Sequence, residues 1–253
     1  MSSDKSTTIR NEAKFTKNMD SSAAISEPRW VRESTIGRHF LASGIWLNWV
    51  LIKSFEDFGE LLTDIDFSSD RVLDAGCGHG LAFPLLEKYF SAKHIIGVDI
   101  DPELINQAKS NPLAIDAQVN LLTTPIEEAD IPEDSLDLIY SHQLLHHTAQ
   151  QKQALEKFRN SLKPGATLLV AESCKNFINL WWVKLFFRHP SSGPKTADQY
   201  IEMLIEANFE ILKVRTSTPW WSRLDLGLLE KLRLVNAGKL APTEILIVAR
   251  KPR

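Results

Sequence analysis

Two carboxylates and a run of glycines have residue types and spacings that suit the binding of a ligand with hydroxyl groups. Asp74 interrupts an apolar run, and glycines follow at positions 76, 78 and 80. Glycines allow a sharp turn and a close approach of the backbone to a ligand, and the start of a helix beyond them offers free N–H groups. A second acid, Asp99, closes another apolar run. An acid in this place can accept hydrogen bonds from both hydroxyls of a ribose.

Asp99 has an alternative role, because an acid at this point could cap the next helix. Asp101 stands directly before Pro102, which suits the first helical turn, and is therefore the better cap. We expect Asp99 to bind the ligand.

Three histidines supply candidate bases after a later apolar run. His142 follows Tyr140 and Ser141, and His146 and His147 come shortly after it. A neutral histidine can take a proton from a phenol, a hydroxyl or an acidic carbon near neutral pH. Each could instead be hydrogen-bonded within a packed core, and His142 is the best placed as a base. His146 and His147 are adjacent and would point apart on a helix, so we expect no metal site.

The elements that position these residues alternate between strands and helices. Strands are predicted at Val72–Ala75, His94–Asp99, Val119–Leu122, Asp137–Ser141 and Thr167–Glu172, and helices at Leu81–Tyr89, Pro102–Ser110 and Gln151–Leu162. Such alternation indicates a parallel sheet covered by helices on both faces. Ligands of these sheets bind at the carboxyl ends of the strands. The acids and His142 all fall at such ends.

The pattern Asp-x-Gly-x-Gly-x-Gly at residues 74–80 resembles the first motif of the class I S-adenosylmethionine-dependent methyltransferases. It differs from the Gly-x-Gly-x-x-Gly of dinucleotide-binding proteins, and Leu81 stands where those proteins need a small residue, which disfavours a nicotinamide oxidoreductase. Leu-Lys-Pro-Gly at 162–165 is similar to the family's turn into the fifth strand, where it would stop the preceding helix. The resemblance covers residues 71–172. It implies an α/β fold, a Rossmann-like seven-stranded, mostly parallel sheet.

Beyond residue 172 the resemblance is looser. A helix is predicted at Thr196–Ala207, and strands at Glu210–Thr216 and Glu244–Arg250. In the family the last two strands form an antiparallel pair at one edge.

The resemblance also implies S-adenosylmethionine as the cofactor and gives the residues roles. Asp74 would meet the methionine amino group above the glycine loop, Asp99 the ribose, and Ile100 the adenine. The residues assigned to the cofactor are Asp74, Gly76, Cys77, Gly78, Gly80, Asp99, Ile100, Ile126, Glu127 and Ser141. Pro125 replaces a frequent aspartate, so the adenine amine would depend on Glu127 or a backbone carbonyl. Glu127 could instead be a solvated loop charge.

We expect residues outside the sheet to determine which substrate the protein binds. We expect a disordered tail at 1–28 and a single domain at 29–253. Within that domain, 29–66 is a helical flank or lid, 71–173 the cofactor-binding core, and 174–195 and 217–243 insertions. All seven tryptophans lie outside the predicted sheet. They favour aromatic walls around an apolar pocket, although packing on the core or contact with a membrane surface would also explain them.

Composition excludes several classes of function. The net charge is -3, which gives no electrostatic case for nucleic acid, and two cysteines are too few for a disulfide framework. With so few cysteines, a reducing cytoplasm is the expected location. No apolar run reaches about 18 residues, so we expect no membrane span.

We therefore expect direct in-line methyl transfer to a small, largely apolar acceptor such as a phenol, a quinone precursor, a polyketide or a lipid. A protein or RNA methyltransferase and a non-catalytic cofactor-binding protein remain the alternatives. Nothing in the sequence sets the oligomeric state.

Overall fold

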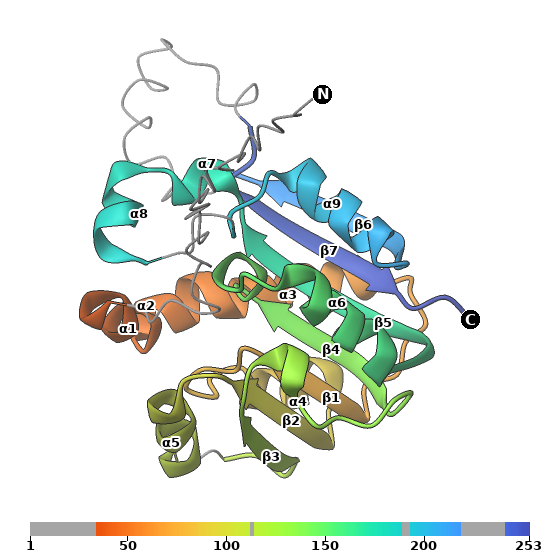
Figure 1. Ribbon diagram of the computed structural model, residues 1–253. Helices are drawn as coiled ribbons and strands as arrows, with labels where there is room; N and C mark the ends of the chain where they lie inside the picture. Colours follow the sequence, from red (N-terminus) through yellow and green to blue (C-terminus); the bar gives the residue numbers. More distant parts are fainter. Residues whose placement is uncertain (1–33, 112–113, 189–192, 219–240) are drawn as a thin grey trace, which may run out of the picture.

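A seven-stranded sheet forms the centre of the computed structural model, which describes residues 34–111, 114–188, 193–218 and 241–253. The strands follow the order β3-β2-β1-β4-β5-β7-β6 (Figure 1). Their bounds are β1 Arg71–Ala75, β2 His94–Asp99, β3 Gln118–Thr123, β4 Leu136–His142, β5 Leu162–Ser173, β6 Glu210–Ser217 and β7 Glu244–Arg250.

Strands β1 to β5 are parallel, whereas β7 runs antiparallel to both of its neighbours, β5 and β6. The strand order reverses between β1 and β4, which pair in register from Val72 with Leu138 to Ala75 with Ser141. This reversal is where open parallel sheets bind ligands. The predicted fold class, including the antiparallel edge, is confirmed.

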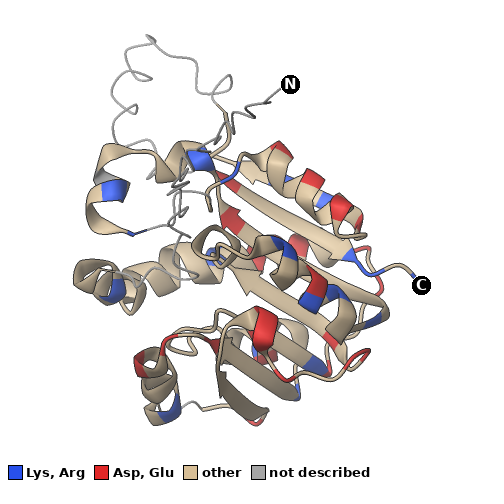
Figure 2. Ribbon diagram, viewed as in Figure 1, with Lys and Arg blue, Asp and Glu red and all other residues tan. Residues whose placement is uncertain are grey.

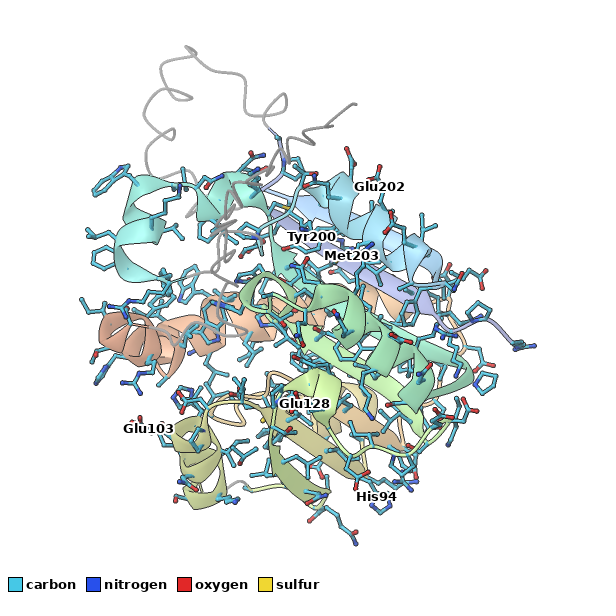
Figure 3. All side chains as sticks on the ribbon, in the orientation of Figure 1. His94, Glu103, Glu128, Tyr200, Glu202 and Met203 are labelled. Carbon is cyan, nitrogen blue, oxygen red and sulfur yellow. The ribbon has the colours of Figure 1, made fainter. Side chains whose placement is uncertain are left out.

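Helices cover both faces of the sheet. One face packs against α3 (Ile52–Leu62), α4 (Phe83–Phe90) and α5 (Pro102–Ser110). The other packs against α6 (Gln151–Ser161) and α9 (Ala197–Glu206), where Tyr200 and Met203 turn toward the strands (Figure 3). β4 is buried on both faces, and its central residues Leu138, Ile139 and Tyr140 are apolar in succession rather than in alternation.

The N-terminal flank consists of α1 (Thr35–Leu41), a short α2 (Gly44–Trp46), a π-helical turn η1 (Leu47–Leu51) and α3. Phe55 and Phe58 of α3 are completely buried against the sheet, and their rings lie 4.7 and 6.1 Å from that of Tyr140. The flank is thus part of the core at α3. Its first turns extend beyond the sheet toward the carboxyl ends of the strands (Figure 1).

Most predicted bounds are within one residue of the observed ones, and two elements begin further from the predicted residue. Helix α4 begins at Phe83 instead of Leu81, because the glycine turn continues through the Phe83 N–H to Gly80 carbonyl bond. Lys163, Pro164 and Gly165 do not follow the helix as a separate turn: α6 ends at Ser161, and these residues begin β5, where Gly165 has φ +78°.

The first insertion forms α7 (Lys175–Ile178) and α8 (Trp181–Phe186). Most of the second insertion and the predicted tail lie outside the described residues. Among the residues that are described, no helix is long and apolar enough to cross a membrane.

Candidate functional site

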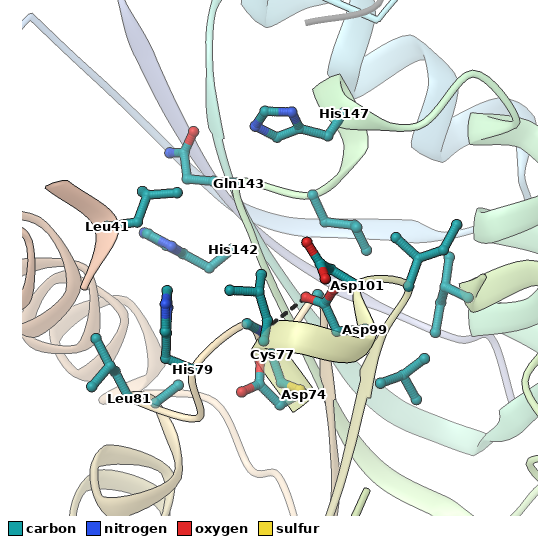
Figure 4. Close-up of a pocket in the computed structure, with 18 of the residues that line it drawn as sticks. Leu41, Asp74, Cys77, His79, Leu81, Asp99, Asp101, His142, Gln143 and His147 are labelled. Carbon is teal, nitrogen blue, oxygen red and sulfur yellow. Dashed lines mark hydrogen bonds between the residues drawn. The ribbon is translucent and has the colours of Figure 1, made fainter. Parts of the chain in front are cut away.

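A cavity of about 220 Å³ opens at the carboxyl ends of β1, β2 and β4, at the reversal of strand order (Figure 4). One side of the cavity is built from the glycine loop after β1, the end of β2 and the loop after β3. We call this the acid side, after Asp74 and Asp99. The opposite side is built from the N-terminal helices and the end of β4. We call it the aromatic side, and its residues are Leu41, Trp46, Leu51, Tyr140 and His142.

The glycine loop on the acid side is held by the neighbouring strand. The N–H groups of Gly76 and Cys77 both donate to the Val98 carbonyl, at 2.8 and 3.0 Å. The glycines at 76, 78 and 80 have φ values of +78°, +51° and +75°, a region that side chains rarely adopt.

The glycines of this loop differ in their surroundings. A Cβ on Gly78 would meet nothing within 4 Å, so this backbone borders open space. A Cβ on Gly80 would lie 2.6 Å from the Phe83 ring. Gly80 is buried and does not line the cavity, so its role is to let the loop pack closely against α4.

Asp99 fixes the loop and still offers acceptor capacity. Its two carboxylate oxygens accept backbone N–H groups from Gly78 at 2.9 Å and from Asp101 at 2.8 Å. Each carboxylate oxygen has a second lone pair, which suits the two hydroxyls of a ribose. Burial raises the pKa of Asp99. Asp101 caps α5 by accepting the Glu103 N–H at 2.9 Å, as predicted.

Asp74 is the more unusual carboxyl. It is 2% exposed, and one of its oxygens has no hydrogen-bond partner among the described residues. Burial, and then the charge of Asp99, raise the pKa of Asp74 to about 8. An ionised carboxylate here needs a cation to offset its desolvation. The methionine part of S-adenosylmethionine carries an ammonium and a sulfonium, so the site fits this cofactor.

The loop after β3 closes the acid side with less polar residues. Ile126 is buried in the short 3₁₀ turn η2 (Ile126–Glu128), and Glu127 and Ile100 are half-buried at the cavity. Thr124 and Pro125 line it as well. Apolar walls with one carboxylate suit an adenine ring that carries an amine.

On the aromatic side, His142 lies between two aromatic rings. It stacks on Tyr140 with ring centres 5.9 Å apart and planes 5° apart, and meets Trp46 edge to face at 5.7 Å. Burial, and to a smaller extent the charge of His146, lower the pKa of His142 to about 3. The ring is therefore neutral at physiological pH. His147 also lines the cavity.

Two more sequence candidates lie away from the cavity. Ser141 is completely buried, because it shares the opposite face of the sheet with its register partner Ala75. His146 is buried and its Nδ1 contacts the Glu172 carboxylate, which also accepts the N–H groups of Leu144 and Leu145. Glu172 thus ties the turn after β4 to β5, a role that the sequence did not indicate.

Several cavity residues were missing from the prediction. His79 could have been predicted to line the cavity, because it lies inside the glycine motif. Others include Arg38, Leu41, Leu51 and Gln143, for which no local pattern gave a signal. Arg38 pairs with Glu103 of α5 at 2.8 Å and so connects the N-terminal flank to the acid side. No group of three or more potential metal ligands occurs in the part of the chain that the structure describes.

Comparison with known proteins agrees with this geometry. Residues 73–170 match the family model described as a methyltransferase domain. The phosphoethanolamine N-methyltransferase of Plasmodium falciparum is 26% identical over 199 residues, which cover 77% of this chain and 71% of the relative. The phosphoethanolamine N-methyltransferase 1 of Arabidopsis thaliana is 28% identical over 107 residues, or 42% of this chain and 21% of the relative.

Solved structures support the same fold at low identity. An S-adenosylmethionine-dependent methyltransferase from Mesorhizobium loti matches with a TM-score of 0.55 at 18% identity, covering 77% of this chain and 97% of that one. The plantazolicin methyltransferase, solved with S-adenosylhomocysteine, has a TM-score of 0.62 at 15% identity and covers 86% and 89% of the two chains.

Proposed function

Because the chain belongs to the class I S-adenosylmethionine-dependent methyltransferases, we propose that it methylates a small acceptor with a largely apolar body. The observation that carries the proposal is the composition of the aromatic side. Leu41, Trp46 and Leu51 approach from the N-terminal helices, and Tyr140 and His142 from β4. Apolar walls with few polar groups are typical of pockets that bind small organic molecules.

S-adenosylmethionine supplies an activated methyl group when it is bound. We assign its ribose to Asp99 and its amino group to Asp74, with Gly78 below. Ile100, Ile126 and Glu127 would border the adenine. The open space above Gly78, the unpaired Asp74 oxygen and the remaining lone pairs of Asp99 support these assignments.

The main task of the aromatic side is to position the acceptor and to exclude water, since direct transfer requires the reacting atoms to be near contact. Trp46 would hold the acceptor body against His142, whose ring is backed by the buried Tyr140. With a pKa of about 3, His142 is a poor general base but a good neutral hydrogen-bond acceptor for a hydroxyl. His147 is the other histidine at the cavity, and we assign it the base role if the acceptor must lose a proton.

A second candidate acceptor is a phosphorylated amine. It is favoured by the names of the relatives, which act on phosphoethanolamine. Arg38 lines the cavity and could meet a phosphate, although its guanidinium already pairs with Glu103. The apolar character of the aromatic side supports the first candidate over this one.

The test is transfer of labelled methyl from S-adenosylmethionine in the presence of an extract of the source cells. Products are separated into organic-soluble, aqueous small-molecule and macromolecular fractions. Our proposal predicts label in the organic fraction, absent with the Asp99→Ala variant. Label in the aqueous fraction, matched by turnover of phosphoethanolamine, would favour the second candidate. Label in protein or RNA would overturn the small-molecule acceptor.

A further inference from the structure

Exposed apolar side chains gather at one end of the molecule. Nine large hydrophobic residues are exposed in the part of the chain that the structure describes, and six of them lie on α1, α2, η1 and α8. We call these six the apolar patch: Ile36, Ile45, Trp49, Trp181, Leu185 and Phe186. Single exposed hydrophobic residues are ordinary, but their concentration on four short elements marks an interaction surface.

The elements of the patch are packed together. Ser34, the cap of α1, donates to the Phe186 carbonyl at the end of α8, and the Phe40 and Phe187 rings lie 5.7 Å apart. Figure 1 shows α8 beside α1 and α2 at the end of the molecule where the parallel strands have their carboxyl ends. Residues distant in the sequence thus form one surface.

The charged residues on the helices that carry the patch are all basic, and one of them, Arg38 of α1, pairs with Glu103 of α5. Between Cys174 and Thr196 the sequence has four lysines and arginines and no acid, although the whole chain has a net charge of -3. Between Ser34 and Phe55 there is again no acid. Figure 2 shows blue on α1, α7 and α8, and no red on these helices or on α2. Lys175 and Lys184 are exposed there.

We propose that this end of the molecule docks on an anionic membrane surface. Exposed tryptophan, isoleucine and leucine insert into the headgroup region, and basic side chains beside them attract anionic lipid. The exposed lysines of α7 and α8, with no acid on these two helices, favour an anionic lipid surface as the occupant. An apolar patch that served a second copy of the chain would gain nothing from like charges that face each other across the interface.

The patch is continuous with the cavity. A row of aromatic rings runs from Phe187 to Phe40, then to Trp46 and His142, with neighbouring ring centres between 5.7 and 5.8 Å apart. Trp46 and His142 line the cavity, and Phe187 follows α8 directly. If the proposed function holds, an apolar acceptor dissolved in the membrane would reach the cavity along this row.

The test is binding of the full chain to vesicles in a flotation assay, without cofactor or acceptor, so that it does not depend on turnover. We expect binding to vesicles of equimolar phosphatidylserine and phosphatidylcholine, weaker binding at high salt, and little binding to phosphatidylcholine alone. Ile45→Glu and Leu185→Glu should each lower the partition coefficient about tenfold, since each removes an inserted aliphatic side chain.

Ile205→Glu is the matched control, because Ile205 is as exposed as Ile45, at 55% against 62%, but lies on α9. It should bind vesicles like the unmodified protein. Equal loss in Ile45→Glu and Ile205→Glu, or no binding to either kind of vesicle, would overturn the proposal. So would a dimer in light scattering that Ile45→Glu dissociates, because the patch would then belong to a second copy.

Discussion

The two sides of the cavity differ in how far apart their residues lie in the chain. The acid side is drawn from residues 74–127, in three strand ends that follow one another in sequence. The aromatic side joins residues 41–51 to residues 140–142, which lie nearly ninety positions further on. The acid side therefore has local sequence motifs. The aromatic side exists only once the flank has folded over β4.

This difference suggests separate tasks. The acid side carries backbone turns, caps and carboxylates that suit one fixed ligand. The aromatic side carries side chains whose identity can change without disturbing the sheet. Each prediction below tests whether the two sides are separable.

The largest expected effect is a loss of stability on substitution of Gly80, because the glycine loop of the acid side packs against the Phe83 ring of α4 at this position. Gly80→Ala would place a methyl group 2.6 Å from the Phe83 ring at a φ of +75°. We expect a loss of about 3 kcal/mol in the free energy of unfolding, from overpacking together with backbone strain, measured by urea denaturation.

Gly78→Ala is its matched control. It has positive φ but no neighbour within 4 Å, so it should cost only about 1 kcal/mol in stability. It should instead weaken cofactor binding, because the methyl would occupy the open space. Equal stability loss in both variants would contradict this assignment.

Asp99→Ala should weaken S-adenosylmethionine binding by about 100-fold, the loss of two hydrogen bonds to a charged acceptor at about 1.4 kcal/mol each. Calorimetry measures the affinity. Asp130→Ala, an exposed acid outside the cavity, should leave it unchanged. Unchanged affinity in Asp99→Ala would remove Asp99 from the site.

Trp46→Ala tests the aromatic side. Removing the indole should raise the acceptor KM by about 30-fold, from lost apolar contact of about 2 kcal/mol, with cofactor affinity unchanged. Ile205→Ala is the control, because Ile205 is exposed on α9, outside both the cavity and the apolar patch. If Trp46→Ala weakened cofactor binding as strongly as acceptor binding, the two sides would not be separable.

The smallest effect concerns pH. With a pKa of about 8, Asp74 is mostly protonated near neutral pH and must lose its proton to receive an ammonium. Cofactor affinity should therefore rise by just under tenfold, on the order of 8-fold, from about pH 6 to pH 7, where the ligand's own amino group stays charged. Asp74→Asn should abolish this slope. A flat profile in the unmodified protein would contradict the role of Asp74.

The sequence predicted the acid side because its signals are local. The bounds of β2, β7 and α5 are those predicted, since apolar runs end at Asp99 and Arg250 and the Asp101-Pro102 pair starts the helix. The glycine spacing and Asp99 needed no information from distant residues.

Ser141 and His146 show what the sequence did not reveal. Side chains alternate along a strand, so Tyr140 and His142 share the face of their neighbour Asp74, whereas Ser141 faces away. The strand pairing had to be known before this could be applied. His146 turns inward because the carboxylate of Glu172, on the next strand of the sheet, contacts both its ring Nδ1 and its backbone N–H. The contact of the N-terminal flank with His142 likewise depends on tertiary packing.

The most direct test of the account is a crystal structure of the protein with S-adenosylhomocysteine bound. We predict ribose hydroxyls on the Asp99 carboxylate, the amino group at Asp74, and the sulfur directed toward Trp46 and His142. A ligand whose ribose lies away from Asp99, or whose sulfur faces away from the aromatic side, would contradict the assignment of the acid side to the cofactor and of the aromatic side to the acceptor.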